Sequence, residues 1–289
     1  IYIGDGQHFN IYSRKDMQLV KKVGRKGEGP EDFRDLAVPV SYKDKLYVND
    51  LRRMSIFTKD GTFVKTMRTN IVSTRVYPMG DKFVSQGASE FKGKNRVEVI
   101  AIHIFDSQFN SLKILGKSLD NYQESAGLRL VPRPFHYRVY DNKIFVGVKE
   151  DFIIDVFDQN GKLLYNIEHD YKRLDVTKED EKGIHDWLKT DPLTRDRYHS
   201  FFKKQAYIPK KFPAYQSFFL DNNKLYVITW KKENGKTECL VFDLKGKFLK
   251  KIFLGIKYRT PSDANPWNVK NGKLYQLYED PDEEEWMVL

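Results

Sequence analysis

Six histidines and one cysteine are the side chains of this 289-residue chain that most often carry catalytic or metal chemistry. No Gly-x-Ser-x-Gly nucleophile motif and no His-Glu-x-x-His zinc motif occurs. Cys239 has no second cysteine with which to form an internal disulfide or a cysteine-based zinc site, and it is expected to be a small buried apolar residue. The histidines are scattered without the spacing of metal ligands: His8, His103, His136, His169, His185 and His199. These patterns favour a protein that is not an enzyme.

Two groups of oxygen-bearing side chains could still bind calcium. Asn49 and Asp50 end one predicted strand, and residues 279–285 form an acidic run in a predicted loop. Carboxylate and amide oxygens are the ligands that calcium prefers. A run of consecutive acids, however, is usually a solvated hairpin. We therefore assign no metal ligands and expect no cofactor, with calcium as the alternative.

A repeated pattern of short strands must position these residues. A strand that begins with lysine recurs along the chain in units of about 45 residues, measured between the aromatic residues at positions 12, 57, 105 and 157 of the strand that follows it. A turn rich in Asp, Asn and Gly precedes each lysine-led strand, as is typical of tight hairpins. A third strand ending in an aromatic residue follows, then a turn and a fourth strand. The lysine-led segments are 45–48, 82–84, 143–146, 224–227 and 273–275, and residues 1–3 fit the same place at the start.

Four short antiparallel strands repeated at this period form the unit of a β-propeller blade. Counting the second strand of each unit gives six, so the pattern predicts an all-β, six-bladed β-propeller in a single domain over residues 1–289. The first unit lacks an inner strand and the last lacks an outer strand. Because propellers often close by overlapping their termini, we expect the natural chain to supply both strands upstream of Ile1.

Residues 169–213 form a predicted helical insertion between blades four and five. Thr177 and Asp180 have the spacing of a capping box, and Ile184, Trp187 and Leu188 form an apolar stripe. Asp191 and Pro192 predict the start of a second helix. The residues expected to pack inward from it are Leu193, Tyr198, Phe201 and Phe202. The two helices would either cover apolar blade ends or form a lid over the central channel.

The connections between strands differ sharply in length at the two ends of the blades. Those from one outer strand to the next inner strand are long, while the hairpin turns at the opposite end are short: we name these ends the long-loop face and the short-turn face. Long loops without regular structure usually bind something, so the site is expected on the long-loop face. The residues expected to contact a partner or an anionic ligand there are Arg52, Arg53, Arg133, His136, Trp187 and Trp230. His136 begins an innermost strand and could face the channel.

Residues 24–33 read Gly-Arg-Lys-Gly-Glu-Gly-Pro-Glu-Asp-Phe. This segment resembles the Gly-Arg-x-Gly-x-Gly-Pro-Gly-Glu-Phe/Tyr signature of bacterial six-bladed β-propellers related to NHL repeats, with Glu31 and Asp32 in place of Gly-Glu. Residues 208–209 and 212–215 also resemble the entry of that group into blade five. The likeness extends over the chain and implies a propeller, and relatives are often exported or lipid-anchored. A phosphate-cradling loop is the alternative for the glycines, although no helix follows them.

The formal charge of +10 permits RNA binding, which some NHL propellers show. Many lysines, however, fall in predicted outer strands, where they discourage edge-to-edge aggregation. The sequence thus predicts a non-enzymatic binding or scaffold propeller for a protein or small anionic ligand. The alternatives are a metal-assisted lactonase or lyase with an ion in the channel, and an RNA-binding propeller; nucleic acid is not the expected partner.

The expected location is extracytoplasmic, at the periplasm or cell surface, with a lipid anchor in an upstream segment as one route. The chain begins with Ile1 and shows no signal peptide of its own. No apolar run approaches the roughly 18 residues that a membrane-spanning helix needs. The sequence carries no information on oligomeric state.

Overall fold

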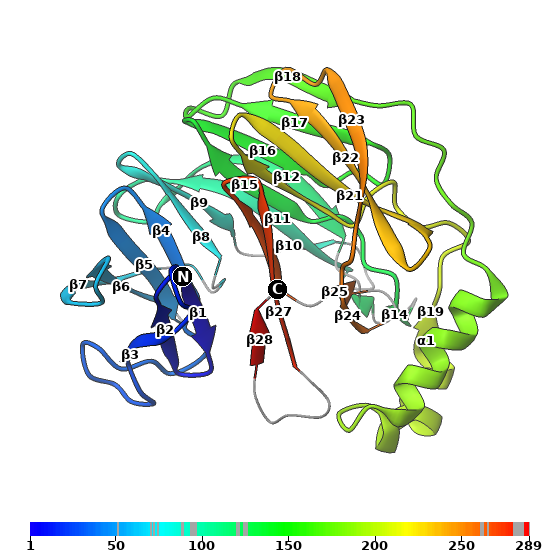
Figure 1. Ribbon diagram of the computed structural model, residues 1–289, viewed down its shortest axis with the longest axis horizontal. Coiled ribbons are helices and arrows are strands. Elements are labelled where there is room, and N and C mark those ends of the chain that lie inside the picture. The colour runs from blue at the N-terminus through cyan, green and yellow to red at the C-terminus, as the bar shows by residue number, and fades with distance from the viewer. Residues whose placement is uncertain are drawn as a thin grey trace.

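The computed structural model describes residues 1–289 except 51, 70, 72, 74, 88–89, 93–96, 120–121, 124–126, 261–262, 265, 280–285 and 289. The chain folds as an all-β propeller with few helices, in which successive antiparallel sheets form the blades (Figure 1). In each complete blade the strands pair in the order of the sequence, so the first strand is the inner edge and the fourth is the outer edge.

The first three sheets take up the N-terminal part of the chain. The first contains β1 (Tyr2–Asp5), β2 (His8–Tyr12) and β3 (Leu19–Val23). The second contains β4 (Pro39–Tyr42), β5 (Lys45–Asp50), β6 (Arg53–Thr58) and β7 (Phe63–Arg68). The third contains β8 (Val76–Met79), β9 (Lys82–Gln86), β11 (Val97–Phe105) and β12 (Ser111–Leu119), with β10 (Glu90–Lys92) paired to β11.

The remaining sheets follow the same plan. One contains β15 (His136–Tyr140), β16 (Lys143–Gly147), β17 (Ile153–Phe157) and β18 (Leu163–Glu168). The next contains β20 (Ser217–Asp221), β21 (Lys224–Glu233), β22 (Lys236–Asp243) and β23 (Phe248–Leu254). The last contains β26 (Trp267–Lys270), β27 (Lys273–Glu279) and β28 (Trp286–Val288). Two small sheets join β13 (Tyr122–Gln123), β14 (Gly127–Arg129) and β19 (Ala206–Tyr207), and β24 (Tyr258–Thr260) with β25 (Asp263–Ala264).

The number of blades differs from the prediction. Counted by the sheets that have an outer strand, which are β3, β7, β12, β18 and β23, the structure shows five blades, not six. The C-terminal sheet β26–β28 has no outer strand among the described residues. The sequence count was wrong because it rested on the second strand of each unit, and the C-terminal sheet has such a strand, β27, without an outer strand among the described residues.

Neighbouring blades are joined through the turns between their third and fourth strands. Gly61, Gly161 and Gly246 each have a positive φ in such a turn. A Cβ at Gly61 would lie 2.7 Å from a methyl carbon of Val23, on the outer strand of the preceding blade, so the turn packs directly on that strand. Gly161 approaches Lys113 and Leu115 of β12 in the same way, and Gly246 approaches Ile167 of β18. Burial of apolar side chains between the sheets then provides the core.

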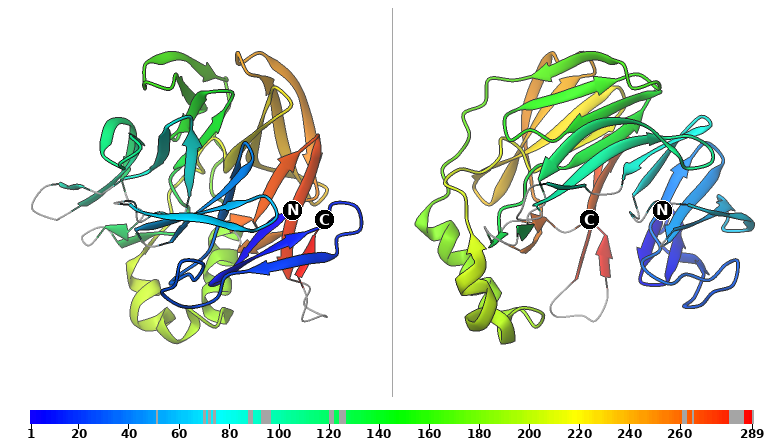
Figure 2. Two further views of the ribbon diagram at one scale, coloured as in Figure 1. Left: turned by 90° about the vertical axis from the view of Figure 1, so that its left-hand side faces the viewer. Right: turned by 180° about the vertical axis from the view of Figure 1, so that it is seen from behind.

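The insertion between β18 and β20 is only partly as predicted. Helix α1 (Lys178–Thr190) begins at the capping box in which the Thr177 hydroxyl accepts from the Asp180 N–H and the Asp180 carboxylate accepts from the Thr177 N–H. Its Ile184 and Leu188 are buried. The views of Figures 1 and 2 place α1 at the periphery of the sheets, beside β19. No helix among the described residues is long and apolar enough to cross a membrane.

The predicted second helix starts later and is irregular. Asp191 ends α1 with extended backbone, and helical turns resume as the 3₁₀-helix η1 (Arg195–Arg197), the π-helix η2 (Tyr198–Phe202) and the short helix α2 (Lys203–Gln205). Tyr198 is buried and Phe202 packs beside it, as expected. Leu193 is 88% exposed, because it lies in the turn that precedes the helical residues.

The segments flanking the insertion are anchored by one carboxylate. Glu150 pairs with Arg129 at 2.8 Å and with Arg173 at 2.6 Å. Arg173 also donates to the Phe212 carbonyl at 2.9 Å, so both ends of the insertion are tied to the loop after β16. The apolar face of α1 meets Val131, Phe212 and Trp230 in one cluster. These contacts support the covering role that was one of the two alternatives for the insertion.

Candidate ligand site at the propeller axis

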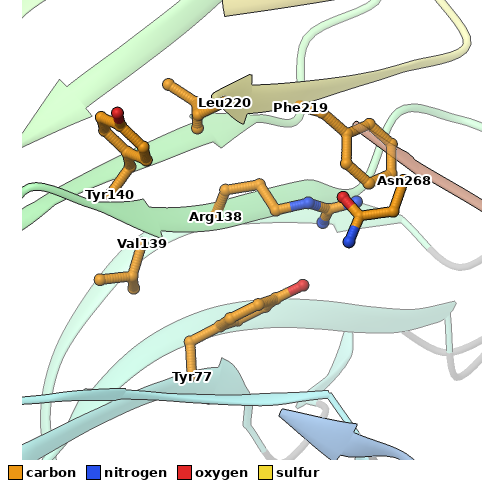
Figure 3. Close-up of a pocket in the computed structure, with 7 residues that line it drawn as sticks. All are labelled: Tyr77, Arg138, Val139, Tyr140, Phe219, Leu220 and Asn268. Atoms are coloured by element: carbon orange, nitrogen blue, oxygen red, sulfur yellow. The ribbon is translucent and has the colours of Figure 1, made fainter. Parts of the chain in front are cut away.

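The inner strands β4, β8, β15, β20 and β26 lie next to one another at the axis of the propeller. A hollow of about 160 Å³ lies among them, which we name the axial pocket (Figure 3). Four sheets contribute to it, since its walls come from β8, β15, β20 and β26. The residues that line it are Tyr77, Arg138, Val139, Tyr140, Phe219, Leu220 and Asn268.

Arg138 is the charged group of the axial pocket. Its guanidinium carbon lies 4.5 Å from the centroid of the Phe219 ring and 5.9 Å from that of Tyr77, distances at which a cation is attracted to an aromatic face. One of its Nη atoms donates to the Tyr137 carbonyl at 2.8 Å. Within the described part of the chain, no carboxylate forms an ion pair with Arg138. The guanidinium therefore keeps donors and a positive charge for a ligand.

Two further polar groups lie beside this guanidinium. The side-chain oxygen of Asn268 accepts from the Val269 N–H at 2.8 Å, while its amide nitrogen donates to no described residue. In Figure 3 the Asn268 amide and the Tyr77 hydroxyl lie on the same side of the pocket as the guanidinium. A few convergent donors in a hollow with apolar and aromatic walls are typical of a small-molecule site, and this set suits a carboxylate.

His136 lies two residues before Arg138 on β15 and packs against aromatic rings. The centroids of Tyr215 and Phe218 are each 6.1 Å from the centroid of its ring. Burial lowers the pKa of His136 from 6.5 to about 3, and the positive charges of Arg138 and Arg75 add to this effect. His136 is therefore neutral at physiological pH. His136 is not among the residues that line the axial pocket.

A second hollow of about 360 Å³, the mouth pocket, adjoins the first and shares Tyr77, Val139 and Tyr140 with it. Its other lining residues are Val40, Ser41, Tyr42, Lys43, Pro78, Asp141 and Asn142. Because Lys43 and the pair Asp141–Asn142 lie in the hairpin turns that follow β4 and β15, this hollow is on the short-turn face. The long-loop face was the expected location.

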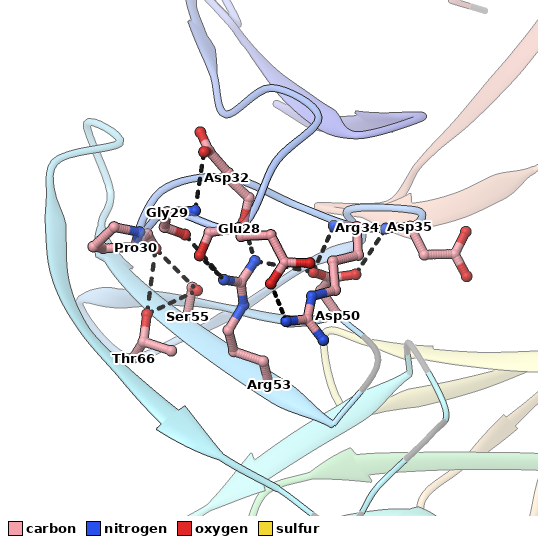
Figure 4. A network of polar contacts seen from close by, with 10 residues as sticks. All are labelled: Glu28, Gly29, Pro30, Asp32, Arg34, Asp35, Asp50, Arg53, Ser55 and Thr66. Carbon is pink, nitrogen blue, oxygen red and sulfur yellow. Dashed lines mark hydrogen bonds and ion pairs between the residues drawn. The ribbon is translucent and has the colours of Figure 1, made fainter.

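The predicted site residue Arg53 holds the glycine-rich loop instead of facing solvent (Figure 4). One of its Nη atoms donates to the Glu28 and Gly29 carbonyls at 3.0 and 2.9 Å. The other donates to the Asp32 carbonyl and lies 3.2 Å from the Asp50 carboxylate. The neighbouring Arg52 is exposed, with a φ of 69°.

The same contacts bear on two other interpretations of this region. Gly29 donates its N–H to the Asp32 carboxylate at 3.0 Å, so the loop has its own anion and the phosphate-cradle alternative gains no support. Asp50 accepts from the N–H groups of Arg34 and Asp35, and the Asn49 amide donates to the carbonyls of residues 71 and 73. Both side chains are thus bound to backbone groups.

The other predicted site residues lie near the insertion. Trp230 stacks on Phe212 with ring centroids 4.5 Å apart, and Trp187 packs in the same apolar cluster. Arg133 is half-buried, three residues before β15. Neither these residues nor His136 line the axial pocket or the mouth pocket. Their predicted role in partner binding stays a prediction.

Metal ligands were not predicted, and the described residues contain no group of three His, Cys, Asp or Glu side chains that could hold an ion. Residues 280–285 of the acidic run lie outside the described residues. Arg138 was not among the predicted site residues, although the sequence carried a signal for it: in a strand, residues two apart share a face, so the position expected for His136 at the channel also applied to Arg138.

No protein-family model matches the sequence, and no curated protein matches it either. Among solved structures, the chain is similar to a member of the DUF4221 family from Bacteroides vulgatus ATCC 8482, with 13% identity, a TM-score of 0.56, and coverage of 97% of this chain and 84% of that one. It is also similar to a candidate exported protein from Bacteroides fragilis NCTC 9343, with 12% identity, a TM-score of 0.51, and coverage of 93% and 73%. At these identities the likeness concerns the fold: both comparisons support a propeller, and a relation to NHL repeats is not confirmed.

Proposed function

We propose that this propeller is a non-enzymatic binding protein whose axial pocket takes a small ligand through a carboxylate group. The observation that carries the proposal is the position of Arg138, a guanidinium between two aromatic rings with no carboxylate paired to it among the described residues. A structural arginine at the centre of a fold is normally paired with an acid, as Arg129 is with Glu150 here. Arg138 lacks that partner, and a ligand would supply it.

The chemistry of the pocket favours a carboxylate over a neutral ligand. Guanidinium presents parallel N–H groups that match the two oxygens of a carboxylate. The Asn268 amide and the Tyr77 hydroxyl add donors at its edge. Each charge-assisted hydrogen bond of this kind contributes about 1.5 to 3 kcal/mol. A hollow of about 160 Å³ accommodates a small group and not a folded domain.

Titration with propanoate tests the anion site. Wild-type protein should bind propanoate at one site, and Arg138→Met should weaken binding at least tenfold, because it removes the charge and keeps most of the side-chain volume. Arg138→Lys should retain part of the affinity, since a point charge replaces the fork of donors. Arg68→Met, on the exposed end of β7, is the matched control and should bind as wild type does. Equal affinity of wild type and Arg138→Met would refute the proposal.

The metal-assisted lactonase or lyase and the RNA-binding propeller have no comparable observation in their favour. The described residues contain no candidate metal ligand set. Arg53, which was expected to contact a partner or an anionic ligand, is occupied by backbone carbonyls. For a protein partner, Trp187 of the insertion and Trp230 of β21 are accessible only in part, because both pack in the same apolar cluster.

An extracytoplasmic location forms part of the proposal. One structure with the same fold belongs to a candidate exported protein, and the described residues contain no membrane-spanning helix. Fractionation of the producing cells, with antibody detection, should find the protein outside the cytoplasm. Recovery in the cytoplasmic fraction alone would contradict this part of the proposal and leave the ligand site untouched.

A further inference from the structure

A hydrogen bond from one blade to the next recurs around the short-turn face. Each complete blade's inner strand ends opposite the lysine that begins its second strand, as Tyr42 does opposite Lys45. The Tyr42 hydroxyl accepts from the Gly80 N–H in the next blade's turn at 2.8 Å. The Tyr140 hydroxyl accepts from the Asn223 N–H at 3.0 Å. We name this arrangement the blade latch.

The latch continues with a different side chain in the next blade. Asp221 ends β20 opposite Lys224, and its carboxylate accepts from the Gly272 N–H at 2.8 Å. The three donors, Gly80, Asn223 and Gly272, lie in tight turns and have φ values of 65°, 55° and 70°. An oxygen acceptor at the end of the inner strand is therefore the common element.

Among the complete blades of the described residues, one lacks this acceptor. The corresponding residue of β8, opposite Lys82, is Met79, whose side chain is 2% exposed and packs in the core with Val84 and Ile144. A thioether is a weak acceptor. The facing turn, Asp141–Asn142, also has positive φ values, 48° and 54°, but makes no latch bond to β8 within the described residues. Lys82 instead reaches the Asn160 side chain at 2.7 Å, farther along the next blade.

The mouth pocket lies at this missing latch. Met79's neighbours Tyr77 and Pro78 form one wall, and Asp141 and Asn142 line it as well. Three tyrosine side chains, Tyr42, Tyr77 and Tyr140, give the hollow aromatic surface on which a ring can pack. Tyr77 and Tyr140 also line the axial pocket, so one ligand can occupy both hollows.

Building on the proposed function, we infer that the missing latch is a second subsite, for a hydroxyl-bearing aromatic ring of the same ligand. The ring lies among Tyr42, Tyr77 and Tyr140, and its hydroxyl takes the place that a tyrosine hydroxyl occupies in the other latches, beside the turn Asp141–Asn142. The carboxylate of the ligand pairs with Arg138. The ligand class is therefore a hydroxyphenyl carboxylic acid.

Two probes that differ by the ring separate the subsites. Wild-type protein should bind 3-(4-hydroxyphenyl)propanoate at least tenfold more tightly than propanoate, measured by calorimetry or ligand-observed NMR. Met79→Tyr brings the protein's own phenol to this junction, so the ratio of the two affinities should fall toward one while propanoate binding is kept. Met17→Tyr, in an exposed turn of the first blade, is the matched control and should keep the wild-type ratio.

A second substitution, at the rim of the mouth pocket, tests the subsite even if Met79→Tyr fails to fold. Ser41 lines the mouth pocket and is exposed, so Ser41→Trp should fill the hollow without disturbing the core and should also lower the ratio. A ratio near one in wild type, or an unchanged ratio in both Met79→Tyr and Ser41→Trp, overturns the subsite even if propanoate binding depends on Arg138. Propanoate binding that survives in Arg138→Met overturns the anion site instead.

Discussion

The guanidinium carbon of Arg138 lies 4.5 Å from the centroid of the Phe219 ring, and the ring centroids of Phe219 and Trp267 are 4.1 Å apart. Strands β15, β20 and β26 thus meet through a cation and two aromatic rings at the axis. Aromatic rings attract the charge without neutralising it. The positive field of Arg138 therefore extends to neighbouring groups such as His136.

The low pKa of His136 should appear in the pH dependence of stability. Unfolded, the imidazole binds a proton below about 6.5, whereas in the folded protein burial and the nearby arginines hold its pKa at about 3. Between these values only the unfolded state gains the proton, so stability is full above pH 6.5 and falls as the pH decreases, by at most about 1.4 kcal/mol per pH unit. His136→Phe should flatten this part of the curve in urea titrations. His199→Phe, at an exposed position, should keep the wild-type slope, and an equally steep slope in His136→Phe would contradict the assignment.

Arg53 should contribute far more stability than its neighbour Arg52. Arg53→Met leaves Asp50 and the carbonyls of the glycine-rich loop without their donor, and removing one partner of such a buried network costs about 3 kcal/mol. Arg52→Asn introduces a residue that tolerates the positive φ of this position, so it should change the free energy of unfolding by about 0.5 kcal/mol or less. Chemical denaturation of both variants measures the difference. Similar losses in the two would show that the Arg53 network is not a stabilising contact.

Two glycines should respond to alanine with opposite signs. A Cβ at Gly147 in β16 would lie 2.4 Å from the Tyr215 hydroxyl and 2.9 Å from the Phe218 ring, so Gly147→Ala should destabilise the junction of two blades by about 2 kcal/mol. Gly183 in α1 has no atom within 4 Å of the added Cβ. Gly183→Ala should therefore stabilise the protein by about 0.5 to 1 kcal/mol through helix propensity. Thermal unfolding of both variants checks the signs, and a destabilised Gly183→Ala would show that packing overrides propensity there.

The parts of the fold that depend on local residue patterns were predictable. The lysine-led strands begin at Lys45, Lys82, Lys143, Lys224 and Lys273 in the structure, as the turn residues before them indicated. The capping box of Thr177 and Asp180 also marks the true start of α1. In both cases the signal and the structure lie within a few residues of each other.

The blade count and the candidate site depend on contacts between distant residues. A lysine-led strand shows that a hairpin forms, but not whether an outer strand completes the sheet. The mouth pocket lies where the inner strand of a complete blade ends in Met79 and not in an oxygen acceptor. The sequence shows Met79, but only the fold shows that the turn after β15 lies beside the pocket. Because of the long loops, we predicted the site on the opposite face. There the Arg53 guanidinium donates to backbone carbonyls of the glycine-rich loop.

The packing of Gly61, Gly161 and Gly246 on the preceding outer strand has a consequence for how this sequence can change. Each of these outer strands is one half of a joint whose other half is encoded further along the chain, as Lys21 and Gly61, which are 40 residues apart, illustrate through their 3.0 Å hydrogen bond. A substitution in such a strand therefore changes the packing against the following repeat as well as the packing within its own repeat. Exchange of single repeats should succeed only when the exchanged segment begins and ends within a blade, because both halves of each joint are then transferred together.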